Sequence, residues 1–69
     1  MIGKRVKHEK YGLGTIKNIM FEGRIREMYI VEFDASNSKF HDCMGLTKEK
    51  HGWFCGKKEV KILDECNRL

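Results

Sequence analysis

Ile25-Arg26-Glu27-Met28-Tyr29-Ile30-Val31-Glu32-Phe33 is the stretch that decides the fold of this chain. It is rich in β-branched and aromatic residues, which favour extended backbone, so it predicts a strand over residues 25–33. Because side chains alternate between the two faces of a strand, Tyr29, Val31 and Phe33 share one face, which we expect to be the core. Met28 and Ile30 lie on the other face. Apolar residues on both faces indicate that the second face is also covered or is a contact surface.

Two further strands precede this one. Residues 2–8 alternate in polarity, and Ile2 and Val6 are an even step apart, which predicts a short strand with one buried face. Tyr11-Gly12-Leu13-Gly14 follows and predicts a tight turn or bulge, since glycine adopts positive φ without steric cost. Residues 14–21 then predict a second strand, with Glu22-Gly23-Arg24 as the hairpin connection into the third.

The second half of the chain alternates between polar turns and short extended pieces. We expect loops over residues 34–39 and 44–50, with a brief extended piece over residues 40–42 between them. A fourth strand over residues 53–55, a turn over residues 56–59 and a fifth strand over residues 60–63 then follow. Five short strands in so short a chain predict an all-β fold, a small five-stranded antiparallel barrel over residues 1–63. Residues 64–69 are then a C-terminal tail.

The composition limits the class of protein. The chain has 69 residues, of which 41% are hydrophobic and 35% charged, so it suits one folded domain rather than a disordered segment. No apolar stretch follows the charged N-terminus and no run has membrane-spanning length, so we expect a soluble cytoplasmic protein. The three cysteines are an odd number, which favours reduced thiols or metal ligands over disulfides.

The formal net charge is +4, and the positive residues gather towards the two ends of the chain. Clustered Lys and Arg side chains attract phosphates and other anions. If the first and last strands pair, as in many small barrels, the two groups merge into one basic patch; the alternative is a solvated face that serves solubility. The two groups are Lys4, Arg5, Lys7 and Lys10, and Lys57, Lys58 and Lys61.

Residues 41–55 contain two of the three histidines, two of the three cysteines and the only tryptophan. In extended backbone, residues two or four apart share a face, so His41 with Cys43 and His51 with Cys55 form an alternative Cys2His2 zinc set. The segment lacks the Cys-x-x-Cys knuckles of common zinc modules. Trp53 would also share a face with the ligands beside it. We therefore prefer an interpretation without metal.

In that interpretation His41, Asp42 and His51 organise the long loop through side-chain-to-backbone hydrogen bonds, and the two cysteines act as small hydrophobes. Trp53 and Phe54 divide between the core and the surface, and the outward one is an aromatic recognition residue. Cys, His and Asp together can also form a nucleophilic site. So small a domain has little room for a shielded pocket, so we expect no enzymatic activity.

Two sets of motifs carry resemblances to known families. Residues 3–16 contain Gly3-x-Arg5-Val6-x-His8-x-x-Tyr11-Gly12-x-Gly14-Thr15-Ile16, and Tyr29-Ile30-Val31-Glu32-Phe33-Asp34 follows. This half resembles small SH3-like barrels of the Tudor and KOW kind, in particular the C-terminal Tudor-like domain of UvrD/PcrA-type helicases, with Tyr11 in place of the usual Phe. After residue 34 the chain departs from that pattern. There, His41-Asp42-x-x-Gly45 and His51-Gly52-Trp53 are similar to small bacterial and phage-type proteins with a His-Asn/Asp…Gly…His-x-Trp signature.

The resemblance implies an SH3-like barrel, and we expect a non-catalytic binding module without a cofactor. Its expected partner is a protein, in a transcription or DNA-processing assembly. One alternative is direct nucleic-acid binding, in which the cations contact phosphate and an aromatic side chain stacks on a base. The other is a zinc-stabilised structural module. The candidate binding residues are Lys4, Arg5, Lys7, His8, Tyr11, Trp53, Lys57 and Lys58.

Overall fold

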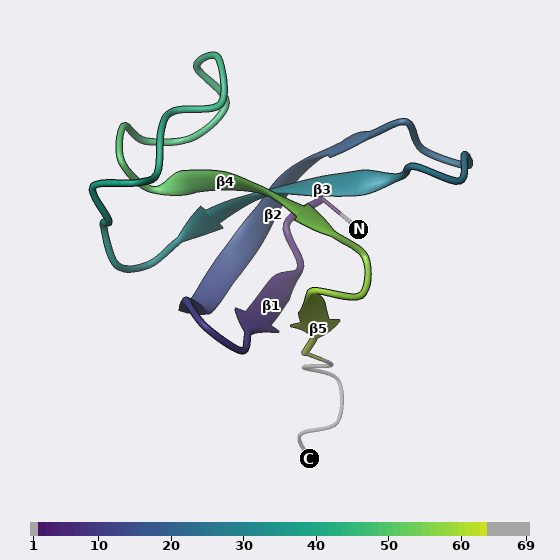
Figure 1. Ribbon diagram of the computed structural model, residues 1–69, viewed down its shortest axis with the longest axis horizontal. Helices are drawn as coiled ribbons and strands as arrows, with labels where there is room; N and C mark the ends of the chain where they lie inside the picture. The colour runs from purple at the N-terminus through teal and green to yellow at the C-terminus, as the bar shows by residue number, and fades with distance from the viewer. Residues whose placement is uncertain (1, 64–69) are drawn as a thin grey trace.

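The computed structural model describes residues 2–63, and within this range the secondary structure consists of five strands and no helix (Figure 1). The strands are β1 (Arg5–His8), β2 (Gly12–Met20), β3 (Met28–Phe33), β4 (Gly52–Gly56) and β5 (Val60–Ile62). All four pairings are antiparallel, in the order β4-β3-β2-β1-β5. The prediction of a small all-β domain with a five-stranded antiparallel sheet is confirmed.

β4 and β5 stand at opposite ends of the strand order, and no ladder joins them within residues 2–63. The predicted C-terminal tail, residues 64–69, lies outside the described range. Within residues 2–63 no helix has the length and apolar character needed to cross a membrane.

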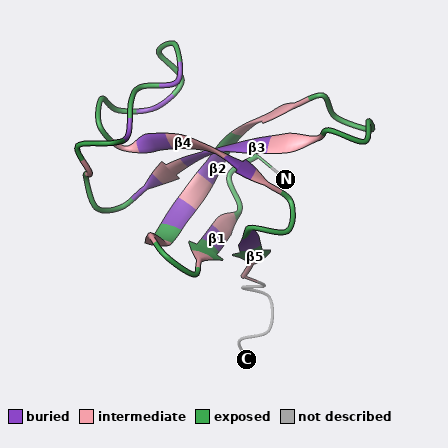
Figure 2. Ribbon diagram, in the orientation of Figure 1, coloured by how far each residue is buried: buried purple, intermediate pink, exposed green. Residues whose placement is uncertain are grey.

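One face of the sheet carries the core, and every strand contributes to it. Tyr29, Val31 and Phe33 are 4%, 0% and 1% exposed, as their shared face predicted. In β2 the register shifts between Ile16 and Asn18, so one extra residue is inserted and the inward face changes from even to odd positions. Figure 2 shows the buried segments of the strands in purple. The buried hydrophobic cluster consists of Val6, Ile16, Tyr29, Val31, Phe33, Phe40, Cys55 and Val60.

The second face of β3 is also covered. Ile30, which alternates with the core residues, is 1% exposed and pairs with Phe54 of β4. Residues 41–47 lie over this side of the sheet, because a Cβ built on Gly52 would point into Cys43 Sγ at 2.8 Å. The His41 ring also lies 5.3 Å from the Phe54 ring. The apolar residues on both faces of β3 therefore reflect burial on both sides.

The first and third strands are shorter than the sequence predicted. Gly3 has φ +92° and turns the chain, so β1 begins at Arg5 and Ile2 is 63% exposed instead of buried. β3 begins at Met28 because two successive turns precede it, with Arg24 N donating to Phe21 O (2.9 Å) and Glu27 N to Arg24 O (3.1 Å). Local hydrogen bonds thus replace ladder bonds at the hairpin tip.

The contrast between Ile25 and Ile30 gives a direct test of the strand boundaries. Ile30→Ala should cost about 2–5 kcal/mol of unfolding free energy, because it empties a fully buried site. Ile25→Ala should change stability by less than about 0.5 kcal/mol, because that side chain is fully exposed. Urea denaturation of both variants measures the difference, and equal losses would contradict the hairpin described here.

Candidate functional site

An open groove of about 680 Å³ lies between the β1–β2 turn, the inner face of β4 and the β4–β5 turn. Three segments far apart in sequence therefore build its walls. Four of the eight predicted binding residues line it, namely His8, Tyr11, Trp53 and Lys58, together with Glu9, Lys10 and Glu59.

His8 sets the shape of the first wall. Its Nδ1 accepts hydrogen bonds from the backbone N–H groups of Lys10 (2.9 Å) and Tyr11 (3.2 Å). Gly12, at φ +86°, completes the turn in a conformation that other residues rarely adopt. The His8 and Tyr11 rings lie 4.7 Å apart. Because Nδ1 is an acceptor, the neutral ring carries its proton on Nε2.

Aromatic contacts anchor both walls to the core. The Tyr11 ring packs edge-on against Phe33 (5.7 Å) and Phe40 (4.9 Å). Trp53 contacts Phe40 at 5.6 Å, and its ring meets that of Tyr11 edge to face at 6.5 Å. Of the two aromatic residues in β4, Trp53 is thus on the inner side and Phe54 on the outer side, and both are half-buried.

The charges around the groove nearly balance. Lys10 and Lys58 supply two cations, and Glu9 and Glu59 supply two anions. Lys10 Nζ lies 5.9 Å above the Tyr11 ring, and Glu59 Oε1 accepts a hydrogen bond from Gly56 N (3.1 Å). The lining of the groove therefore lacks the excess of cations that a polyphosphate backbone favours.

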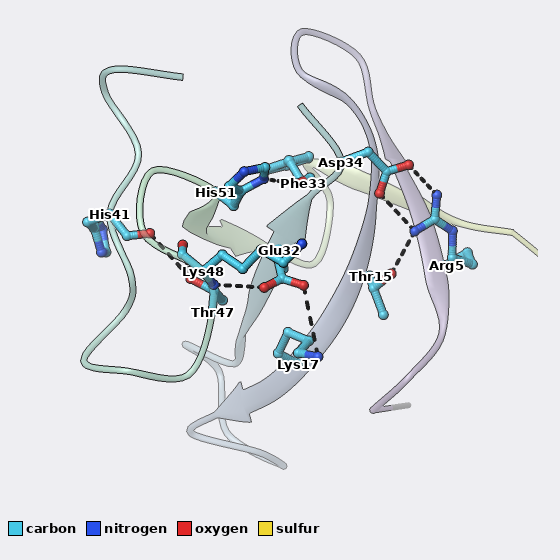
Figure 3. Close-up of polar contacts among 10 residues, drawn as sticks. All are labelled: Arg5, Thr15, Lys17, Glu32, Phe33, Asp34, His41, Thr47, Lys48 and His51. Atoms are coloured by element: carbon cyan, nitrogen blue, oxygen red, sulfur yellow. Dashed lines mark hydrogen bonds and ion pairs between the residues drawn. The ribbon is translucent and has the colours of Figure 1, made fainter. Parts of the chain in front are cut away.

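The remaining predicted binding residues lie elsewhere. Arg5 is held by the Asp34 carboxylate (2.6 and 3.0 Å) and by the Thr15 hydroxyl (2.7 Å), as Figure 3 shows. This guanidinium keeps the pKa of Asp34 below its usual value, mainly through the hydrogen bonds. Lys57 pairs with Glu27 at 3.3 Å. Neither these two cations nor Lys4 and Lys7 line the groove.

The three loop residues make side-chain-to-backbone hydrogen bonds. His41 Nδ1 accepts from Cys43 N (3.0 Å), and Asp42 Oδ1 accepts from Met44 N (3.1 Å). His51 Nδ1 lies 2.7 Å from the Phe33 carbonyl oxygen, so it is the donor there (Figure 3). In the described part of the chain, this loop has a single isolated β-bridge, between His41 and Gly52. The side-chain hydrogen bonds therefore hold a loop that has no ladder of its own beyond this bridge.

Two side chains that were not predicted from the sequence also hold this loop. Glu32 Oε2 accepts a hydrogen bond from Lys48 N (2.7 Å), and the Thr47 hydroxyl donates to the His41 carbonyl (3.3 Å), as drawn in Figure 3. Glu9 and Glu59 at the groove were not predicted either. For the groove, the sequence offered one signal, which is that Glu59 follows Lys58 in a predicted turn. The role of Glu32 could not be predicted, because it depends on where the loop folds back onto the sheet.

The four alternative zinc ligands do not come together among residues 2–63. Cys55 belongs to the inner core, whereas Cys43 lies against Gly52 on the outer face of the sheet. His41 and His51 use their Nδ1 atoms for backbone contacts. The spacing in the sequence is compatible with a Cys2His2 zinc site, but it does not reveal that β4 separates the two thiols.

One other group of three potential ligands exists in the described range. Atoms of His8, Cys55 and Glu59 lie within 4.8 Å of one another. The His8 tautomer is set by two backbone donors, which leaves Nε2 protonated and Nδ1 occupied. Burial, followed by the charges of Glu59 and Cys43, raises the pKa of the Cys55 thiol to about 12. This group therefore presents a thiol and an N–H rather than a thiolate and a free ring nitrogen.

Comparison with known proteins gives no match to a family model, to a curated protein or to a solved structure.

The close approach at Gly52 predicts a specific sensitivity. Gly52→Ala should cost about 1–3 kcal/mol of unfolding free energy, because its new Cβ would meet Cys43, Thr47 and the His41 carbonyl. Gly56→Ala is the matched control in the same strand, since its Cβ meets only the Glu59 side chain at 3.7–3.8 Å. Thermal or urea denaturation compares the two, and similar costs would argue against the packing of this loop.

The buried thiols predict a pH dependence. Because the pKa of Cys55 is raised, this thiol keeps its proton in the folded state at pH values where it loses the proton in the unfolded state. The unfolding free energy is therefore unaffected by this group below about pH 9 and decreases as the pH rises towards 12. At about pH 10.5 wild type should have lost about 1–2 kcal/mol more than Cys55→Ala, relative to each protein at about pH 8. Urea titrations at the two pH values measure this, and parallel losses would contradict it.

Proposed function

We propose that this chain is a non-catalytic, SH3-like binding module that holds an extended segment of a partner protein in the groove lined by Tyr11 and Trp53. The observation that carries the proposal is the groove itself, which draws four of the predicted binding residues from three separate segments. Aromatic residues in a concave, partly desolvated position are the side chains that contribute most to protein interfaces.

The charges and the rigidity of the groove support a peptide ligand. Two cations and two anions at its rim can pair with a segment of mixed charge. Tyr11 and Trp53 are fixed by ring contacts with Phe40 and Phe33, so binding orders few additional side chains. By resemblance of residues 3–16 and 29–34, we place the partner in a transcription or DNA-processing assembly.

The arrangement of the titratable side chains favours binding over catalysis. Burial raises the pKa values of both Cys43 and Cys55, so neither thiol is an activated nucleophile. His8 uses Nδ1 to hold the turn, which removes the acceptor nitrogen that a general base requires.

Selection of random peptides displayed on phage against the immobilised full chain tests this function. Enriched peptides, resynthesised and titrated by Trp53 fluorescence, should bind about tenfold or more weakly to Tyr11→Ser and Lys58→Glu. Leu46→Ser is the control, because that 40% exposed side chain lies in the loop after β3 rather than in the groove. Circular dichroism confirms that each variant folds.

Oligonucleotides provide the opposing arm. Single-stranded and duplex DNA and RNA should show only weak binding at near-physiological salt. If an oligonucleotide binds tightly, loses affinity steeply with salt, and no selected peptide depends on Tyr11 or Lys58, the chain is a nucleic-acid-binding module and the peptide proposal is wrong.

A further inference from the structure

Among residues 2–63, β5 forms one end of the sheet and pairs with β1 alone (Figure 1). Its partners are in register, with Val60 opposite His8, Lys61 opposite Lys7 and Ile62 opposite Val6. The first and last strands therefore pair, which was the condition for the two basic groups to lie close together. No strand within residues 2–63 lies on the other side of β5.

The hydrogen-bond pattern shows where the backbone groups of β5 point. Leu63 N donates to Arg5 O at 2.9 Å, so Arg5 and Leu63 face each other as a hydrogen-bonded pair. In an antiparallel ladder such pairs alternate with non-bonded ones, so the next bonded pair is Lys7 with Lys61. The N–H and C=O groups of Val60 and Ile62 consequently point away from β1. They have no hydrogen-bond partner among residues 2–63.

The two lysines beside this edge destabilise the sheet. Lys7 and Lys61 are exposed and directly opposite each other, where like charges destabilise a sheet. Neither has an ion pair in the described range. A shallow concavity of about 260 Å³ joins them to the groove, since it is lined by Lys7, Glu9, Lys58, Glu59, Val60 and Lys61, three of which also line the groove.

We propose that β5 receives an extended acidic segment of the partner protein as a sixth strand. The inference rests on the function proposed above and specifies its partner, because the edge continues directly into the groove. The outward N–H and C=O groups of Val60 and Ile62 bond the incoming backbone. Acidic side chains at alternate positions neutralise Lys7 and Lys61.

The lysine pair and the outward backbone groups of β5 together favour one kind of ligand. Lysine on a sheet edge opposes pairing with apolar or basic strands, because its charge would be crowded or partly desolvated. An acidic strand removes that penalty. Since side chains alternate, the residues between the acidic ones face the side of Ile62, which is partly buried and packs against the core. The preferred segment alternates acidic and aliphatic residues.

A blocked synthetic peptide of alternating Glu and Val is the probe, titrated into the ¹⁵N-labelled full chain. We expect the largest amide shifts at Val60 and Ile62. The same peptide N-methylated on alternate amides, or with Lys in place of Glu, should bind about tenfold or more weakly. These arms leave the protein unaltered, so they do not depend on a variant that folds.

Lys61→Glu provides the test within the protein. It should weaken the Glu/Val peptide about tenfold or more, yet raise the melting temperature, because it places an opposite charge across from Lys7. Lys39→Glu, at an exposed loop position, carries the same charge change and should leave affinity within about twofold. Weaker binding with higher stability cannot arise from a damaged fold.

Each other result overturns the edge proposal. Tight binding that survives N-methylation, or shifts confined to Tyr11 and Trp53, places the peptide in the groove alone. Protection of the Val60 and Ile62 amides from hydrogen exchange in the free monomer means the chain covers its own edge. A dimer in sedimentation that the peptide cannot dissociate assigns the edge to a second copy. In contrast, a Glu/Val peptide that binds β5 while no phage peptide depends on Tyr11 overturns the groove function alone and supports the edge proposal.

Discussion

The structure depends on one set of ring contacts that joins the core to the surface. Phe33 stacks on Phe40 at 5.1 Å, and these two rings support Tyr11 and Trp53 in turn. The same contacts therefore hold the long loop, the β1–β2 turn and β4 together. Because the groove walls are the outer members of a packed aromatic cluster, their positions are fixed before any ligand arrives.

The long connection between β3 and β4 is ordered without a ladder of its own. Hydrogen bonds from His41, Asp42 and Thr47 satisfy backbone groups within it, and Glu32 and His51 attach it to β3. It can lie flat on the sheet only because Gly52 has no side chain. The loop covers one face of β3 and β4 while leaving the groove on the other face open.

The groove and the concavity beside β5 adjoin, because Glu9, Lys58 and Glu59 line both. The groove has aromatic walls and balanced charge, whereas the β5 side has three lysines beside two glutamates and backbone groups that have no hydrogen-bond partner among residues 2–63. Lys7 and Lys61 face each other as like charges across β1 and β5. In our proposal, an extended acidic segment of the partner neutralises them and continues into the groove.

The sequence by itself determined the elements whose signals are local. Alternation identified the core face of β3. The turn was predicted over residues 11–14, but only Gly12 has a positive φ, and Gly12, Leu13 and Gly14 already pair with β1. Two predicted strands begin too early in the chain, at Ile2 and Ile25, because strand propensity does not account for turn hydrogen bonds that compete with the ladder. Only the tertiary structure decided which residues meet: β4 separates Cys43 from Cys55, and β1 aligns Lys7 with Lys61. Such proximity depends on register and loop path, which couple residues far apart in the chain and leave no periodic pattern within it.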